Sequence, residues 1–102
     1  MTEKRTAHHD LASIQRAFAQ GQGLFTKVAA RDAAALGYGS RDIVAVIQTM
    51  KPGQFYKSMT SHYDESVWQD VYHVPHDGAV LYVKFTDNAS LIEFTLLSFK
   101  EK

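Results

Sequence analysis

Hydrophobic residues recur every three or four positions in the first half of the chain, whereas in the second half they alternate with polar residues. The first set of apolar positions is Leu11, Ile14, Ala17 and Phe18. This spacing predicts a helix that buries one face. We expect Asp10 to cap its N-terminus and Gly21 and Gly23 to end it.

Three more short elements are predicted before the middle of the chain. Residues 24–28 favour a strand, and the alanine-rich stretch 29–36 predicts a second helix that stops at Gly37. Ser40 is expected to cap a third helix, which Pro52-Gly53 ends. The buried stripe of this third helix is expected to consist of Ile43, Val44, Ile47 and Met50.

The second half of the chain predicts an antiparallel sheet. The expected strands cover residues 55–61, 67–74, 79–86 and 91–100. Asp77-Gly78 is typical of a two-residue hairpin turn, and Asp87-Asn88 is expected to form the next turn. Helices followed by such a meander predict one α+β domain over residues 1–102, with the helices packed on one face of a mostly antiparallel sheet.

Composition then narrows the classes of function. A chain of 102 residues with 45% hydrophobic residues can bury a core. The absence of cysteine excludes disulfides, thiolate nucleophiles and cysteine-based metal sites, and it fits a reducing cytoplasm. Eleven basic and eleven acidic residues give a formal net charge of zero. This balance argues against a general polyanion binder but allows a local basic pocket.

The N-terminal residues and the aliphatic runs of the chain do not predict a membrane protein or a secreted one. The first residues, MTEKRTAHHD, have no apolar stretch after the basic positions, and the longest aliphatic run is Ile43 to Ile47. We therefore expect no signal peptide and no membrane span. The expected location is the cytoplasm.

Polar and aromatic side chains crowd the predicted strands between residues 55 and 74. This stretch, FYKSMTSHYDESVWQDVYHV, contains lysine, glutamine, histidine and several tyrosines. These side chains are either ordinary solvent-exposed residues or a binding site for a polyanion. The chain has no H-E-x-x-H motif, carboxylate cluster, Gly-rich phosphate loop or histidine spacing that favours metal binding. We therefore expect no metal and no cofactor.

Five short motifs add a resemblance to this pattern. They are EKRTAH (residues 3–8), FYKSMT (55–60), WQDVY (68–72), LYVK (81–84) and SFKEK (98–102). In this order and spacing, the chain resembles the MqsR toxins, the motility quorum-sensing regulator family, over almost its whole length. It departs from the family pattern between Tyr72 and Gly78, where HVPHDG stands in place of a more arginine-rich connection, and at Ala7, where a proline is usual.

The resemblance implies a fold and an activity. The family belongs to the RelE-like mRNA interferases, the toxin halves of type II toxin–antitoxin pairs. It implies a ribosome-independent endoribonuclease that cuts single-stranded mRNA at short GC-containing sites and inhibits growth. It also implies a partner, an MqsA-type antitoxin with a zinc-binding domain and a helix-turn-helix domain.

The resemblance also implies site residues. The active-site positions of the family fall on Lys57, Gln69 and Tyr82. Further contacts to RNA are expected from Lys84, His73 and Lys100, the last of these in the terminal motif. Metal-independent cleavage needs a base for the ribose 2′-hydroxyl, donors for the phosphate and an acid for the leaving 5′-oxygen.

The pKa values of the free side chains suggest a catalytic role for each of these residues. Free lysine and tyrosine have pKa values of about 10.4 and 10, so both are protonated at neutral pH. Tyr82 is therefore expected to be the general acid or a phosphate donor, and Lys57 to stabilise the phosphate. Lys57 could be the base only if its surroundings lowered its pKa. Gln69 is expected to orient a phosphate oxygen, the 2′-hydroxyl or a base edge.

His73 has two possible roles. Strand alternation puts it on the same face as Gln69, at a distance of about 13 Å along the strand. For that reason we expect His73 to contact a neighbouring phosphate, while a general base with a free pKa near 6.5 is the alternative.

Each candidate residue also has an interpretation in which it has no part in catalysis. A strand lysine such as Lys57 is usually solvated, and Tyr82 would more often be a core aromatic residue. Trp68 is expected to be a packing anchor, and His8 and His9 to lie on the surface near the first helix. A non-catalytic RNA- or protein-binding module on the same scaffold is the competing function.

Overall fold

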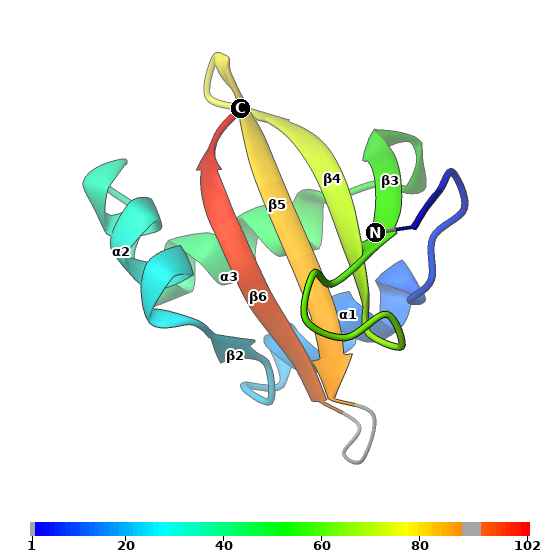
Figure 1. Cartoon of the computed structure of the whole chain (residues 1–102). Helices are drawn as coiled ribbons and strands as arrows, with labels where there is room; N and C mark the ends of the chain where they lie inside the picture. Colours follow the sequence, from blue (N-terminus) through cyan, green and yellow to red (C-terminus); the bar gives the residue numbers. More distant parts are fainter. Residues whose placement is uncertain (1, 89–92) are drawn as a thin grey trace.

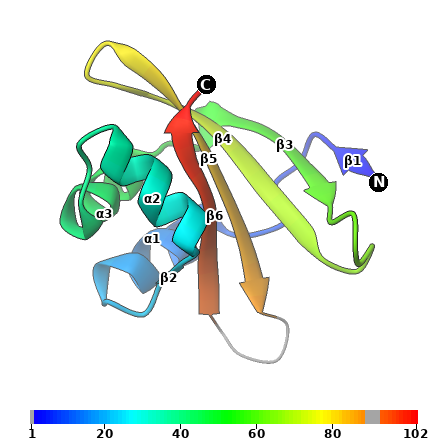
Figure 2. The same cartoon turned by 60° about the vertical axis from the view of Figure 1, so that its left-hand side comes forward.

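Three helices lie against one face of a six-stranded sheet in the computed structural model, which describes residues 2–88 and 93–102. The helices are α1 (Leu11–Ala19), α2 (Lys27–Ala35) and α3 (Ser40–Thr49), followed by the 3-10 turn η1 (Pro52–Gln54). The strands are β1 (Glu3–Lys4), β2 (Leu24–Phe25), β3 (Phe55–Thr60), β4 (Trp68–His76), β5 (Ala79–Asn88) and β6 (Glu93–Glu101). In Figure 1 the sheet lies in front of the helices, and Figure 2 shows the helices gathered on one side of it.

The sheet is antiparallel except at one edge. Its strand order is β1-β3-β4-β5-β6-β2, and the short strand β2 pairs parallel to β6. The four longest strands form the meander that the sequence predicts, with each neighbouring pair antiparallel. The α+β class with helices on one face of a mostly antiparallel sheet is therefore confirmed.

The core lies between the helices and the facing side of the sheet. Its fully buried side chains include Ile14, Ile43, Ile47, Tyr72, Val83, Phe85 and Phe99. They come from alternate positions of the strands and from one stripe of each helix, which is the arrangement that the hydrophobic pattern predicts. Burial of this apolar surface is the main favourable term in the folding of the chain.

The helix caps agree with the predictions at one helix and differ at two. Asp10 caps α1 and accepts a hydrogen bond from the Ser13 amide at 3.1 Å. Helix α2 begins earlier than predicted, because Thr26 is the N-cap and accepts from the Ala29 amide at 3.1 Å. The predicted strand over 24–28 is consequently reduced to β2.

In α3 the predicted cap is wrong by one residue. The N-cap is Gly39, and Ser40 is the first helical residue. The Gly39 amide donates to the Asp42 carboxylate at 2.8 Å, so that the first turn is capped from within the helix. The buried stripe contains Val46, whereas Val44 is only partly buried.

The two predicted turns of the meander also have different outcomes. Asp77 and Gly78 form the β4–β5 turn with φ values of 49° and 80°, as a two-residue hairpin requires. Asp87-Asn88 is not a turn, because β5 continues through both residues and Asp87 pairs with Phe94. The predicted beginning of the last strand, Leu91-Ile92, lies outside the described residues. Strand β1, which was not predicted from the sequence, pairs antiparallel with β3.

Candidate active site

The face of the sheet turned away from the helices, which we call the open face, carries most of the predicted site residues. The cross-strand register sets one row of side chains on this face: Lys57 pairs with Val71, Val71 with Lys84, and Lys84 with Ser98. Neighbouring strands lie about 4.8 Å apart. The two lysines therefore flank the strand that separates them, and Val71 between them is fully buried. Two cationic side chains thus stand on either side of a small apolar floor.

The next row along the strands contains the other candidate groups. Tyr82 pairs with His73 on one side and with Lys100 on the other. The Lys100 Nζ lies 5.4 Å from the centre of the Tyr82 ring. Tyr82, His73 and Lys100 therefore form one continuous strip beside the lysine row.

A β-bulge adds Tyr56 to this strip. Phe55 pairs with Tyr72 and Lys57 pairs with Val71, so Tyr56 is the extra residue of β3. Its ring stacks on His73 with a centroid distance of 4.2 Å and an interplanar angle of 22°. Because a bulge re-aims a side chain, two successive residues of β3 approach the open face. Strand alternation alone does not predict this contact, so Tyr56 was not among the candidate residues in the sequence.

Gln69 lies on the open face but apart from Tyr82. It pairs with Met59, one row beyond Lys57 and Val71. His73 is therefore the immediate neighbour of Tyr82, whereas Gln69 lies about 13 Å from His73 along β4. The expectation that His73 contacts a neighbouring phosphate was based on its distance from Gln69, whereas the register places His73 directly opposite Tyr82.

Lys57 is held as a cation by a carboxylate. Its Nζ donates a hydrogen bond to Oε1 of Glu3 at 2.6 Å, and its side chain is 20% exposed. This hydrogen bond raises the pKa of Lys57 and lowers that of Glu3. The lowered pKa that a lysine base would need is therefore absent. Glu3 itself was missed in the sequence analysis, because strand β1 that positions it was not predicted.

Burial perturbs the other titratable groups of the open face. It raises the pKa of Tyr82, against a smaller opposing effect of Lys57. It lowers the pKa of Lys84, to which Lys100 also contributes. It lowers the pKa of His73, with a further contribution from Lys102. The face thus combines a protonated tyrosine and lysine with an imidazole that is mostly neutral at pH 7.

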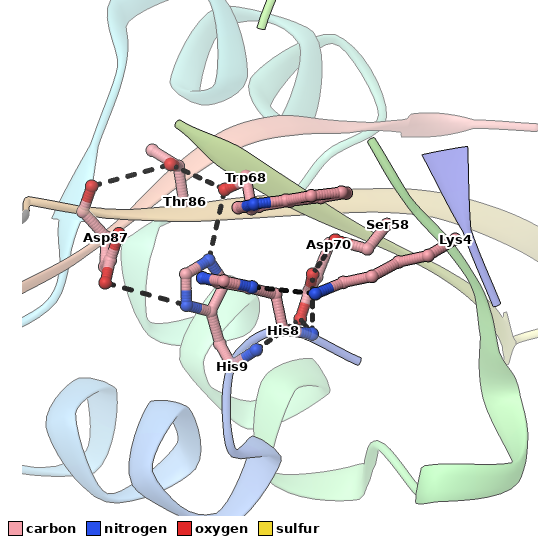
Figure 3. Close-up of polar contacts among 8 residues, drawn as sticks. All are labelled: Lys4, His8, His9, Ser58, Trp68, Asp70, Thr86 and Asp87. Carbon is pink, nitrogen blue, oxygen red and sulfur yellow. Dashed lines mark hydrogen bonds and ion pairs between the residues drawn. The ribbon is translucent and has the colours of Figure 1, made fainter. Parts of the chain in front are cut away.

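A buried carboxylate connects the N-terminal segment to these strands. Asp70 is fully buried and accepts hydrogen bonds from the amides of His8 and His9, at 3.0 and 2.8 Å, and from the Ser58 hydroxyl at 2.6 Å. Figure 3 shows these groups converging on one side chain. Since hydrogen bonds to a buried charge are strong, Asp70 fixes the segment that leads back to β1.

Aromatic contacts complete this attachment. The His8 ring stacks on Trp68 at 5.4 Å, and Lys4 Nζ lies 4.1 Å from the centre of the Trp68 ring and donates to His8 Nδ1 at 2.9 Å (Figure 3). Trp68 therefore packs the N-terminal segment, in agreement with its expected role. His9 is buried rather than on the surface, and its Nε2 lies 3.1 Å from the Trp68 carbonyl oxygen.

The hollows found in the described part of the chain lie away from the row of lysines on the open face. One hollow, of about 510 Å³, is lined by residues such as Leu11, Phe55 and Tyr72 on the helix side of the sheet. Among residues 2–88 and 93–102, no group of three or more His, Cys, Asp or Glu side chains is placed to hold a metal ion. No helix in the same ranges is long and apolar enough to cross a membrane.

Two comparisons with known proteins bear on the identity of the chain. The family described as "Motility quorum-sensing regulator, toxin of MqsA" matches residues 6–101. A curated relative named "mRNA interferase toxin MqsR", from Escherichia coli strain K12, is 35% identical over 100 residues, which cover 98% of this chain and 99% of the relative. On this match, and with a basic and aromatic face assembled from the motifs themselves, the chain belongs to the motility quorum-sensing regulator family of toxins.

Proposed function

We propose that this toxin is an endoribonuclease that cleaves single-stranded mRNA without a metal ion. The 2′-hydroxyl of one nucleotide attacks the adjacent phosphate, and the products are a 2′,3′-cyclic phosphate and a 5′-hydroxyl. The name of the Escherichia coli relative, an mRNA interferase toxin, supports the activity. The observation that carries the chemistry is the register that brings Lys57, Tyr82, Lys84 and Lys100 onto one open face.

The lysines of the face would stabilise negative charge on the phosphate. Lys57 is firmly protonated beside Glu3, and Lys84 lies two strands away in the same row. Cations fixed before the reaction stabilise the crowded phosphate of the transition state without reorganisation. Lys100, at the end of the next row, would bind an adjacent phosphate.

Tyr82 would supply the proton that the leaving 5′-oxygen needs. Its raised pKa keeps the phenol protonated at neutral pH, and the phenol is a donor in that state. Gln69, farther along β4, would contact the neighbouring nucleotide rather than the reacting phosphate. This separation is consistent with a strand of RNA that runs across the sheet.

The finer specificity follows from the family resemblance. We propose that cleavage is independent of the ribosome and occurs at short GC-containing sites. We also propose an MqsA-type antitoxin as the inhibitor, because the family is described as the toxin of MqsA. An antitoxin that covered the open face would block the RNA directly.

A cleavage assay tests the proposal. Purified protein is incubated with 5′-labelled single-stranded RNA in EDTA, and the ends of the products are mapped. We expect discrete cuts that end in a 2′,3′-cyclic phosphate. Loss of all cutting in EDTA with recovery in magnesium would refute the metal-independent mechanism, and RNA binding without cleavage at any pH would favour the non-catalytic binding module.

A growth experiment tests the biological role. Expression of the toxin alone should stop growth, and co-expression of its antitoxin should restore it. Lys57→Ala should be harmless at the same expression level. Normal growth with abundant wild-type protein that still cleaves RNA in vitro would contradict the toxin assignment.

A further inference from the structure

His73 occupies a central place on the open face that no step of the proposed chemistry yet uses. It is the direct cross-strand partner of Tyr82, with ring centres 6.1 Å apart. Its other side stacks on Tyr56 at 4.2 Å. The imidazole is thus held between two aromatic residues, beside the group proposed as the acid.

The edge of the His73 ring is available to a ligand. The side chain is neither fully buried nor fully exposed. Within residues 2–88 and 93–102, neither ring nitrogen has a hydrogen-bond partner, and both ring contacts are made through the ring itself. A ring stacked through one face on Tyr56 and lying beside Tyr82, with its nitrogens unoccupied, can exchange a proton with a ligand.

The surroundings of His73 determine its charge. The titratable or charged groups that face it from the neighbouring strands and the C-terminus are Tyr56, Lys57, Tyr82, Lys84, Lys100 and Lys102. Partial burial, with a smaller contribution from Lys102, disfavours a positive charge on His73 and lowers its pKa. A neutral imidazole accepts a proton at pH 7, whereas Lys57 with its raised pKa does not.

We propose that His73 is the general base that removes the proton from the attacking 2′-hydroxyl of the RNA. This inference rests on the proposed ribonuclease function and deepens it. It assigns a role in the chemistry to a position at which this chain departs from the family pattern, between Tyr72 and Gly78.

The proton transfers of the reaction then balance between the neighbouring side chains His73 and Tyr82. A ring nitrogen of His73 takes the 2′-hydroxyl proton while the 2′-oxygen forms its bond to phosphorus. The bond between phosphorus and the 5′-oxygen breaks, and the Tyr82 hydroxyl gives its proton to that oxygen. His73 returns the proton to the Tyr82 phenolate, directly or through water, and both residues regain their initial states without a co-reactant.

The interpretation of His73 as a phosphate contact fits the structure less well. It depended on a large distance between His73 and the reacting phosphate, and the register removes that distance. A phosphate contact also benefits from a permanent positive charge. The surroundings of His73 oppose such a charge, and three lysines already supply it on the same face.

Variants at His73 distinguish a base from a phosphate contact. Single-turnover cleavage is measured in EDTA between pH 5 and 9 for wild type, His73→Gln and His73→Arg. We expect both variants to lose about 10²–10⁴ in rate. The wild-type rate should fall on the acidic side, below the ordinary histidine pKa of about 6.5, and the variants should lack that limb. His76→Gln is the matched control, since it lies in the same strand but contacts Tyr38 on the helix side.

Two further measurements exclude indirect effects. Thermal unfolding should show that His73→Gln remains folded. Binding of an RNA with a 2′-methoxy group at the cut site should be unchanged in His73→Gln and unchanged or tighter in His73→Arg. A large loss of binding that accounts for the lost rate would overturn the proposal in favour of a binding role.

A modified substrate separates the base from the acid. In an RNA with sulfur in place of the leaving 5′-oxygen, the leaving group needs no proton. Tyr82→Phe should then recover most of its rate, whereas His73→Gln should stay slow. Recovery of His73→Gln, or wild-type cleavage by His73→Arg with an intact acidic limb, would overturn the inference while leaving the ribonuclease proposal in place. A wild-type protein that cleaves no RNA would overturn both.

Discussion

At the scale of single residues, the open face holds its titratable groups in opposite states of protonation. Glu3 stabilises the positive charge of Lys57, whereas burial and neighbouring cations disfavour the charge of Lys84 and His73. Acid and base roles become separable when their surroundings move the pKa values of neighbouring groups apart. Tyr82, whose pKa is raised by burial, and His73, whose pKa is lowered by burial, form such a pair.

Removal of a single donor from the face should slow cleavage strongly. We expect Lys57→Ala and Tyr82→Phe each to reduce the single-turnover rate by about 10²–10³, because each removes one electrostatic or proton donor from the transition state. Thermal unfolding should change little. Lys27→Ala, at an exposed lysine of α2, is the control. Near-normal rates in both site variants would refute their assignment.

Glu3 should compete with RNA for Lys57. Its carboxylate occupies the ammonium group that a phosphate would contact. In Glu3→Gln the competing charge is gone, and we expect binding of a non-cleavable RNA to tighten by about two- to fivefold, the range of an exposed ion pair. Fluorescence anisotropy at low salt measures this. Weaker binding would show instead that Glu3 is needed to position Lys57.

At the scale of elements, a β-bulge and a buried carboxylate determine where side chains of the open face lie. The bulge in β3 brings Tyr56 onto His73. The buried Asp70 ties residues 8 and 9 to β3 and β4, and so holds the segment that leads to β1 and Glu3. The site therefore depends on a strand that the chain adds to the edge of its sheet.

Asp70 is the residue on which this attachment most depends. In Asp70→Asn the new amide N–H group meets donors, and the carboxylate's hydrogen bonds are lost or weakened. We expect a loss of about 2–4 kcal/mol in the free energy of unfolding, measured in urea. Hydrogen exchange at the amides of His8 and His9 should accelerate beyond this global effect. Asp64→Asn, in an exposed loop, is the control, and equal stability of the two variants would contradict the role of Asp70.

At the scale of the whole molecule, the formal net charge is zero, but acidic and basic side chains lie in different places. Asp10 and Asp42 cap helices, and Asp70 is buried. Lysines meanwhile gather on the open face in two neighbouring rows. A balanced chain can in this way present one basic surface to a polyanion.

The salt dependence of RNA binding should report on this surface. Each phosphate contact to single-stranded RNA contributes about −0.7 to the slope of log affinity against log salt concentration. We expect Lys100→Ala to make the slope less negative by about 0.7, with the same effect on RNAs of different sequence. Lys27→Ala should leave the slope unchanged. An unaltered slope in Lys100→Ala would show that Lys100 does not touch phosphate.

The sequence by itself determined the elements and the family. Helix and strand periods are local properties of the chain, so α1, α3 and the four strands of the meander were predictable to within a few residues. Five motifs in order predicted the family, and strand alternation placed Gln69, Val71 and His73 on one face. The predicted boundaries were wrong at Thr26, Gly39 and Asp87-Asn88, because helix caps and pairing with a neighbouring strand set the observed boundaries.

The tertiary structure alone decided which side chains of that face meet. Alternation fixes the face of a residue but not the partner across the strand, because register depends on bulges and on pairing between distant segments. Only the register places His73 opposite Tyr82 and moves Gln69 away from it. Similarly, the short strand β1 has too few residues for a periodic signal. It exists because Thr60 and Asp70, about sixty positions along the chain, bind the backbone of residues 2, 8 and 9.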